Sequence, residues 1–331
     1  MTFANRLQRS VPVIVSLAII ALAVHGLTRI LRGIRLADVL AQFHLIPSSR
    51  LLAGALLVVA LYTALAIYEA IAARHVGGPI SARRAALGAL LAAPIGHVIG
   101  WGAVSGGAIR YRIYRAVRMR PLDIGKLALL AAMPYPAGLG LLLGLSLTVQ
   151  SAAAAACLHV PAQLARSAGI GLLVLTLVYL TLVLRQHGPF VLGRLQLRLP
   201  PPPLTAVQYC TGVIEVCCGA GILYLLLPDS LGMPFAAFIG LYVLSVLAGL
   251  ASSMPAGAGA FEFVLFALLL PRLSREQLLG SVLAYRVVFE LAPLLSALAL
   301  FALYEAWWHL PAQRRRLEAL RRQEPDCEPR G

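Results

Sequence analysis

Long apolar runs separated by short polar gaps dominate this sequence. A helix needs about 20 apolar residues to cross the hydrocarbon core of a bilayer. Runs close to that length predict six membrane-spanning helices, at residues 11–31, 51–72, 127–149, 168–185, 206–227 and 279–304. The first run follows a basic start and is long for a signal peptide, so we expect a retained helix there.

Two further apolar segments, 86–104 and 234–270, are less regular and bring the total to about 6–8 membrane segments. Pro94 interrupts the first, which ends in Ser-Gly-Gly, and the run SSMPAGAG at 252–259 interrupts the second. Such interruptions free backbone groups that lipid cannot satisfy, so they occur where the chain faces protein or a wet cavity. We therefore expect broken or re-entrant helices at both places.

Composition supports a membrane protein. Of the 331 residues, 60% are hydrophobic and 12% are charged, whereas soluble domains average about 45–50% apolar and about 25% charged residues. A soluble enzyme is therefore excluded, and the expected fold is an all-α polytopic membrane protein. The net charge of +15 does not indicate a nucleic-acid partner, because most basic residues lie in gaps between apolar runs.

Basic residues concentrate in alternate gaps, and this asymmetry sets the expected orientation. The segment 110–126 is the most basic gap, whereas 150–165 and 228–233 are nearly free of basic residues. The basic gaps share one side of the membrane if 86–104 enters and returns as a re-entrant hairpin. We expect a single transmembrane domain over 1–310, a basic tail over 311–331, and both termini in the cytoplasm.

The two irregular segments also indicate an internal repeat. SGGAIR ends at Arg110, and GAGAFE ends 152 residues later at Glu262. Glu69 and Glu215 each lie in the preceding apolar run, 146 residues apart. With halves over about 11–150 and 166–305, three crossings per half would invert the second half, which is typical of transporters that bind cargo at broken helices. Chance recurrence of small residues before helices is the alternative.

Ionisable side chains inside apolar runs are candidates for function, because each costs about 2.5–3.5 kcal/mol on insertion scales. The candidates are Glu69, Glu215, Glu262, Arg286 and Glu290. Glu69 lies late in its run and could reach the interface instead. Arg286 and Glu290 are four residues apart on one helix face, so an internal ion pair is an equally good interpretation.

Small residues beside these charges complete the candidate substrate-binding set. Arg110 follows Gly106 and Gly107, and Glu262 follows Gly257 and Gly259. Exposed backbone N–H groups beside a guanidinium make a phosphate-binding corner, which would suit a phospholipid head group. Histidines and cysteines show no metal-ligand spacing, and there is no P-loop, so we expect no metal, no cofactor and no ATP hydrolysis by this chain.

Three segments resemble the lysylphosphatidylglycerol synthase transmembrane family, which includes the flippase domain of the multiple peptide resistance factors. They are SGGAIRYRIY at 105–114, MPAGAGAFE at 254–262 and LAYRVVFELAP at 283–293, and IRLADVLAQFHLIP at 34–47 is similar to that family's linker. The resemblance covers nearly the whole chain. Glu69, Arg110, Glu215 and Glu262 match, by position, charged sites that the family places inside its translocase domain.

The resemblance implies a bacterial plasma membrane protein that moves aminoacylated phosphatidylglycerol or a related lipid between leaflets. The resistance factors carry an aminoacyltransferase domain after the last helix. This sequence ends there, so we expect a stand-alone member that is not an enzyme. Three alternatives stay open: a partner of a separate lipid-modifying enzyme, an intramembrane enzyme using Glu215 or Glu262 as a base, and a small-solute transporter. Membrane phospholipids are the expected partners, and a homo-oligomer is also open.

Overall fold

The computed structural model describes residues 46–77, 80–99, 102–152, 155, 160–185, 190–192, 195–197, 200–252, 257 and 259–309. Two features expected from the sequence, the first span at 11–31 and the basic tail at 311–331, lie outside the described residues, as does most of the linker at 34–47.

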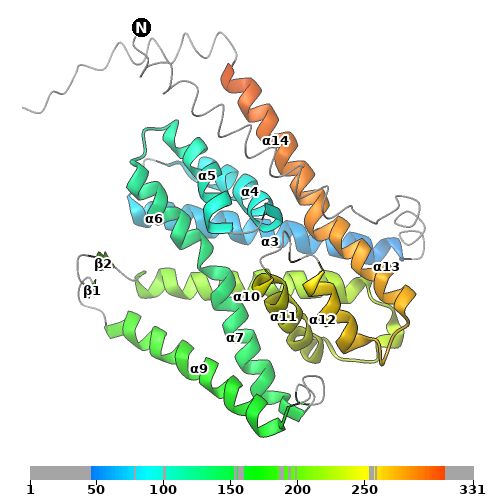
Figure 1. Ribbon diagram of the computed structural model, residues 1–331. Coiled ribbons are helices and arrows are strands. Elements are labelled where there is room, and N and C mark those ends of the chain that lie inside the picture. The colour runs from blue at the N-terminus through cyan, green and yellow to red at the C-terminus, as the bar shows by residue number, and fades with distance from the viewer. Residues whose placement is uncertain are drawn as a thin grey trace, which may run out of the picture.

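Helices make up almost all of the described chain (Figure 1). In order they are α3 (Ser48–Val76), α4 (Ala82–Ile99), α5 (Gly102–Arg115), α6 (Pro121–Ala132), α7 (Pro134–Val149), α9 (Ala162–Arg185), α10 (Pro202–Leu226), the 3-10 turn η1 (Asp229–Leu231), α11 (Phe235–Ala251), α12 (Ala260–Leu269), α13 (Arg275–Tyr285), the π-helix η3 (Arg286–Leu291) and α14 (Ala292–His309). Between α9 and α10, β1 (Phe190–Leu192) pairs with β2 (Leu195–Leu197) in a short antiparallel hairpin.

Five helical segments of the described chain are long and apolar enough to cross a membrane. They are α3, α6 with α7, α9, α10, and α13 with α14. These segments coincide with five of the six predicted spans, and the sixth lies outside the described residues. The shorter helices α4, α5, α11 and α12 occupy the two irregular segments. The protein is therefore an all-α polytopic membrane protein, as the sequence predicts.

Helix ends fall where the sequence satisfies or removes the unpaired backbone groups. Gly77 ends α3 in the left-handed conformation (φ 77°), and its N–H bonds back to the last turn. Proline opens α6 and α10. Its missing N–H costs nothing there, because the first N–H groups of a helix have no acceptor within the helix. Ser274 and Gln277 form a reciprocal capping box at the start of α13.

The two halves of the chain repeat the same order of elements. Helices α3 to α7 and α10 to α14 each comprise a long helix, two shorter helices and an interrupted long helix. The long helices α3 and α10 lie side by side and run in opposite directions (Figure 1). Arg50 at the start of α3 donates to the carbonyl of Leu227 at the end of α10, and Leu204 at the start of α10 joins the core around Ala72 at the end of α3. The second half is thus inverted, as expected.

Each half packs its last helix on the other half. Helix α7 packs against α10 and α11, and α14 packs against α4. Leu139 and Leu143 of α7 consequently belong to the core of the second half, whereas Leu294 and Phe301 of α14 belong to the core of the first half. The interlocked halves bring side chains from both repeats to the centre of the molecule.

The interruptions of the two last helices correspond as well. Helix α6 ends before Pro134, which opens α7 and cannot donate a hydrogen bond to the preceding turn. Its counterpart 152 residues later is Arg286, which opens the π-helix η3. Such π-turns inside α-helices often occur at functional sites.

The predicted small-residue turn at 105–107 is wrong. Gly106 and Gly107 lie inside α5, and the interruption between α4 and α5 precedes Gly102. Helix α4 also continues through Pro94. The second predicted turn is present: α11 ends at Ala251, and α12 begins only at Ala260.

Helix α9 needs an apolar environment on most of its surface. Only 11% of its most apolar 18-residue stretch is buried inside the protein. Large side chains such as Leu175, Leu177 and Leu184 are exposed. An exposed apolar surface of this kind is stable when lipid or another apolar surface covers it. Helix α9 therefore lies at an edge of the described fold that lipid or another apolar surface must cover.

Candidate functional site

Glu69 of α3 and Arg110 of α5 form a buried bidentate ion pair. Arg110 donates from Nε to Oε1 of Glu69 at 2.8 Å and from Nη2 to Oε2 at 2.7 Å. The hydroxyl of Tyr114 also donates to Oε1 at 2.8 Å. All three side chains are buried. Glu69 therefore does not reach the interface, because its carboxylate is held inside the first half.

Gly106 allows the Arg110 guanidinium to lie against α4. A Cβ atom at position 106 would lie 2.9 Å from Nη1 of Arg110 and 3.2 Å from the carbonyl oxygen of Ala92. The expected phosphate corner of free N–H groups at Gly106 and Gly107 is wrong, because both residues lie beyond the first four of α5, where N–H groups bond to the preceding turn. Gly107 has room for a side chain.

A second buried charge centre joins α12 to η3. Arg286 donates from Nε to Oε1 of Glu262 at 2.8 Å and forms an ion pair with Glu290 one turn along its own helix. The other carboxylate oxygen of Glu262 accepts from the N–H of Gly259 at 2.7 Å, and the guanidinium lies 5.3 Å from the ring centre of Phe261. The predicted Arg286–Glu290 pair is thus present, and Glu262 shares its arginine.

The glycines before Glu262 adopt conformations that other residues rarely take. Gly257 has φ 64° and Gly259 has φ 90°. A Cβ atom on Gly257 would lie 2.8 Å from the Cα of Gly249 in α11. The turn therefore depends on glycine, both for its backbone angles and for its close approach to α11.

Glu215 pairs with a histidine from the other half. The Nε2 atom of His97 in α4 lies 3.2 Å from Oε1 of Glu215 in α10. Glu215 is among the candidates expected from the sequence and His97 is not, because only the tertiary fold brings these two side chains together. One local signal was available: His97 is a titratable side chain on an otherwise apolar stretch of α4.

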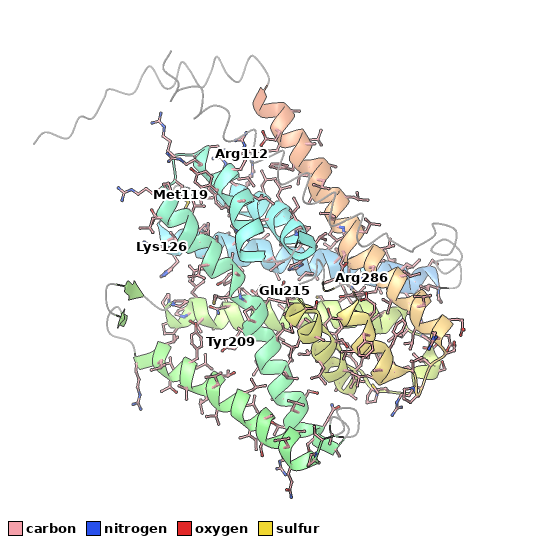
Figure 2. The ribbon with its side chains drawn as sticks, viewed as in Figure 1. Arg112, Met119, Lys126, Tyr209, Glu215 and Arg286 are labelled. Carbon is pink, nitrogen blue, oxygen red and sulfur yellow. The ribbon has the colours of Figure 1, made fainter. Side chains whose placement is uncertain are left out.

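The His97–Glu215 pair and the Glu262–Arg286–Glu290 group lie within electrostatic range of each other, and we call these five residues the central cluster. Glu290 interacts electrostatically with His97 as well as with Arg286 and Glu262, and Tyr62 is within electrostatic range of both Glu215 and Glu290. Figure 2 shows Glu215 and Arg286 in the middle of the helix assembly, whereas Lys126 lies at its edge. The Glu69–Arg110 pair forms a separate, closed centre in the first half.

Tyrosines surround the central cluster. The hydroxyl groups of Tyr242 and Tyr285 are 2.9 Å apart and form a hydrogen bond, and the ring of Tyr135 lies 6.0 Å from that of His97. The cluster is open at two places, since the side chains of His97 and Glu262 are 31% and 26% exposed. Glu215 and Glu290 are buried between them, at 4% and 9%.

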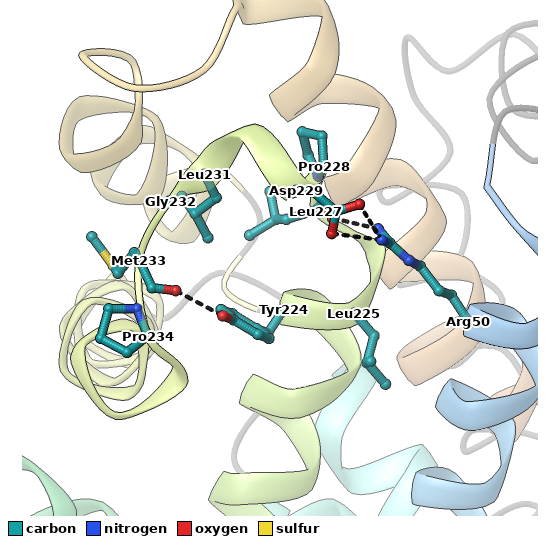
Figure 3. A pocket seen from close by; sticks show the side chains of 10 residues that line it. All are labelled: Arg50, Tyr224, Leu225, Leu227, Pro228, Asp229, Leu231, Gly232, Met233 and Pro234. Carbon is teal, nitrogen blue, oxygen red and sulfur yellow. Dashed lines mark hydrogen bonds and ion pairs between the residues drawn. The ribbon is translucent and has the colours of Figure 1, made fainter.

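The described residues contain no group of three or more histidine, cysteine, aspartate or glutamate side chains placed to hold a metal ion. A cavity of about 390 Å³ lies elsewhere, at the connection from α10 to α11 (Figure 3). Arg50 lines it and donates to Asp229 at 2.6 Å, and Tyr224 donates to the carbonyl of Met233 at 2.7 Å. None of the charged candidates lines this cavity.

Known proteins resemble the chain over different lengths. An uncharacterized protein of Synechocystis sp. is 28% identical over 316 residues, which are 96% of this chain and 98% of the relative. The inner membrane protein YbhN of Escherichia coli is 28% identical over 259 residues, or 77% of this chain and 80% of YbhN. Comparison with protein-family models gives no match. These relatives support a membrane-embedded protein over most of its length.

A shorter likeness links the chain to lipid chemistry. A phosphatidylglycerol lysyltransferase of Staphylococcus epidermidis is 36% identical over 97 residues, which are 28% of this chain and 11% of the lysyltransferase. A lysyltransferase of Staphylococcus xylosus is 35% identical over 96 residues. The family resemblance expected from the sequence is thus supported in part.

Proposed function

We propose that this protein is a lipid translocase of the bacterial plasma membrane. It would move a phospholipid, an aminoacylated phosphatidylglycerol or a related lipid, from one leaflet to the other without changing it. The termini would lie in the cytoplasm, on the side of the basic gaps. The likeness to phosphatidylglycerol lysyltransferases supports this lipid class.

The central cluster is the observation that carries the proposal. Its side chains come from α4 of the first half and from α10, α12 and η3 of the second half. A relative movement of the halves would therefore remodel the cluster. Burying this many charges is expensive, and binding sites formed by broken helices near the middle of inverted repeats are typical of transporters.

In this proposal, the head group enters the protein while the acyl chains stay in the bilayer. Arg286 carries the guanidinium that would bind the lipid phosphate through a fork of N–H donors when its pairs with Glu262 and Glu290 open. Glu215, Glu262 and Glu290 carry negative charge that can compensate an aminoacyl ammonium group. Arg110 would be a secondary phosphate-binding residue, because its Nε and Nη2 atoms already donate to Glu69. The phosphate would bind its Nη1 atom, or would bind the guanidinium after the pair with Glu69 opens.

Transfer of labelled lipid between leaflets of proteoliposomes tests the proposal. Phosphatidylglycerol and its lysyl ester would be compared for the wild type, Arg110→Ala and Glu262→Ala. Arg275→Ala and Glu276→Ala are matched controls, since both side chains are exposed at the start of α13. We expect transfer by the wild type and both controls, and its loss in the two site variants. Wild-type rates equal to those of protein-free vesicles for both lipids would contradict the proposal.

A further inference from the structure

The central cluster contains more negative than positive charge. It holds three carboxylates and one guanidinium: Glu262 and Glu290 pair with Arg286, and Glu215 pairs with His97. His97 is the one further titratable group in the cluster, and it adds positive charge only when protonated. With a neutral histidine the cluster carries two uncompensated negative charges. Uptake of one proton would reduce this charge where its burial is costly.

One carboxylate oxygen in the cluster is available to accept a proton. Oε1 of Glu290 is paired with Arg286. Among the described residues, by contrast, no group donates a hydrogen bond to the buried Oε2 atom of Glu290. The Glu290 side chain is only 9% exposed. A buried carboxylate oxygen without a donor is unusual, and protonation removes the charge that makes it costly.

His97 is the most exposed side chain of the cluster. Its imidazole is 31% exposed, lies 3.2 Å from Glu215 and interacts electrostatically with Glu290. Both the imidazolium and the neutral tautomer protonated on Nε2 can donate to Glu215. Histidine changes its charge within about one or two units of neutral pH. His97 is therefore the member of the cluster placed to pass a proton between its exposed face and Glu215.

We propose that His97, Glu215 and Glu290 form a proton-binding site whose occupancy is coupled to lipid transfer, so that one proton crosses the membrane with each transfer cycle. The coupling rests on the proposed function, whereas the proton site stands on the cluster alone. A proton enters at His97 and is shared among the three groups. It leaves, after the halves have moved, on the other side, so protons are conserved over the cycle.

Other titratable or charged groups lie within electrostatic range of this site. They are Tyr62 from α3, Tyr135 from α7, Cys218 from α10, Tyr242 from α11, Glu262 from α12, Tyr285 from α13 and Arg286 from η3. Tyrosine and cysteine ordinarily titrate above neutral pH, and arginine stays charged. The proton site is therefore assigned to His97, Glu215 and Glu290.

Infrared titration of the full chain in lipid bilayers tests the proton site without any transport. Between about pH 8 and pH 5, the wild type should gain a protonated-carboxyl band. Glu290→Gln should remove or halve it, and His97→Gln should shift its midpoint. The matched substitutions Glu276→Gln and His75→Gln, at exposed positions, should leave it unchanged. A band that neither Glu290→Gln nor His97→Gln alters would overturn the proton site.

The leaflet distribution of labelled phosphatidylglycerol under a pH gradient tests the coupling. With the membrane potential clamped, one proton per lipid means that a gradient of about one pH unit changes the equilibrium leaflet ratio about tenfold. His97→Gln and Glu290→Gln, checked for monodisperse elution, should abolish this asymmetry. A ratio that ignores the pH gradient, or follows a sodium gradient instead, overturns the coupling. If the wild type transfers no lipid, the proposed function fails, and the infrared titration still decides the proton site.

Discussion

Removing the carboxylate of Glu69 should destabilise the protein more than removing the guanidinium of Arg110. In Glu69→Ala, Arg110 keeps a charge that it cannot lose by deprotonation, inside a buried site. Breaking a buried ion pair in this way costs about 3–5 kcal/mol. In Arg110→Met, Glu69 keeps the hydrogen bond from Tyr114 and can take up a proton, so we expect a loss of about 1–3 kcal/mol.

The assay is equilibrium unfolding in detergent micelles, followed by far-ultraviolet circular dichroism. The double variant Glu69→Leu/Arg110→Met removes both charges and should recover most of the lost stability, because apolar replacements of buried ion pairs are often neutral. Asp123→Ala is the control: its partner Lys126 is exposed, and such pairs contribute less than about 1 kcal/mol. Equal losses in the two single variants, or a double variant no more stable than Glu69→Ala, would refute the reasoning.

Two further predictions concern packing and capping. Gly212→Ala should destabilise the protein by about 1–3 kcal/mol or more, because the new Cβ would lie 1.9 Å from the carbonyl oxygen of Pro134. Gly140→Ala is the control and should not destabilise it, because the space around Gly140 is open. Thermal unfolding of both variants checks this prediction, and equal unfolding midpoints would contradict it. Ser274→Ala should lower the free energy of unfolding by about 1 kcal/mol, because the Ser274 side chain accepts a hydrogen bond from the N–H of Gln277 at the start of α13. Unchanged amide hydrogen exchange in the first turn of α13 would contradict the role of this cap.

The membrane spans and the repeat could be predicted because each depends on the order and length of segments along the sequence. A span requires a fixed length of apolar residues, so five runs coincide with helical segments of the structure. The recurrence of a long apolar run, an irregular segment and a further long run also corresponds to the repeated order of helices in the two halves. The Arg286–Glu290 pair was foreseeable since four residues separate its members, although the π-helix around it was not.

Partners of the other charges could not be predicted, because tertiary packing selects them. Arg110 meets Glu69 from 41 residues away, and His97 meets Glu215 only because α4 packs beside the inverted second half. The glycine pair at 106–107 was misassigned for the same reason. Glycine in a helix interior is unfavourable by about 1 kcal/mol, so sequence favours a turn, but the close approach of Arg110 and Ala92 at Gly106 favours the helix.

The most direct test of the account is leaflet transfer by a variant that lacks the second charge centre and still folds. Glu262→Gln/Arg286→Met/Glu290→Gln removes the arginine together with both carboxylates that pair with it, which costs less stability than removing the arginine alone. We predict that wild-type protein moves labelled phosphatidylglycerol faster than protein-free vesicles do, and that this triple variant, with unchanged helix content, falls to the protein-free rate. A folded triple variant that transfers lipid as fast as the wild type would contradict the claim that the central cluster carries the head group across the membrane.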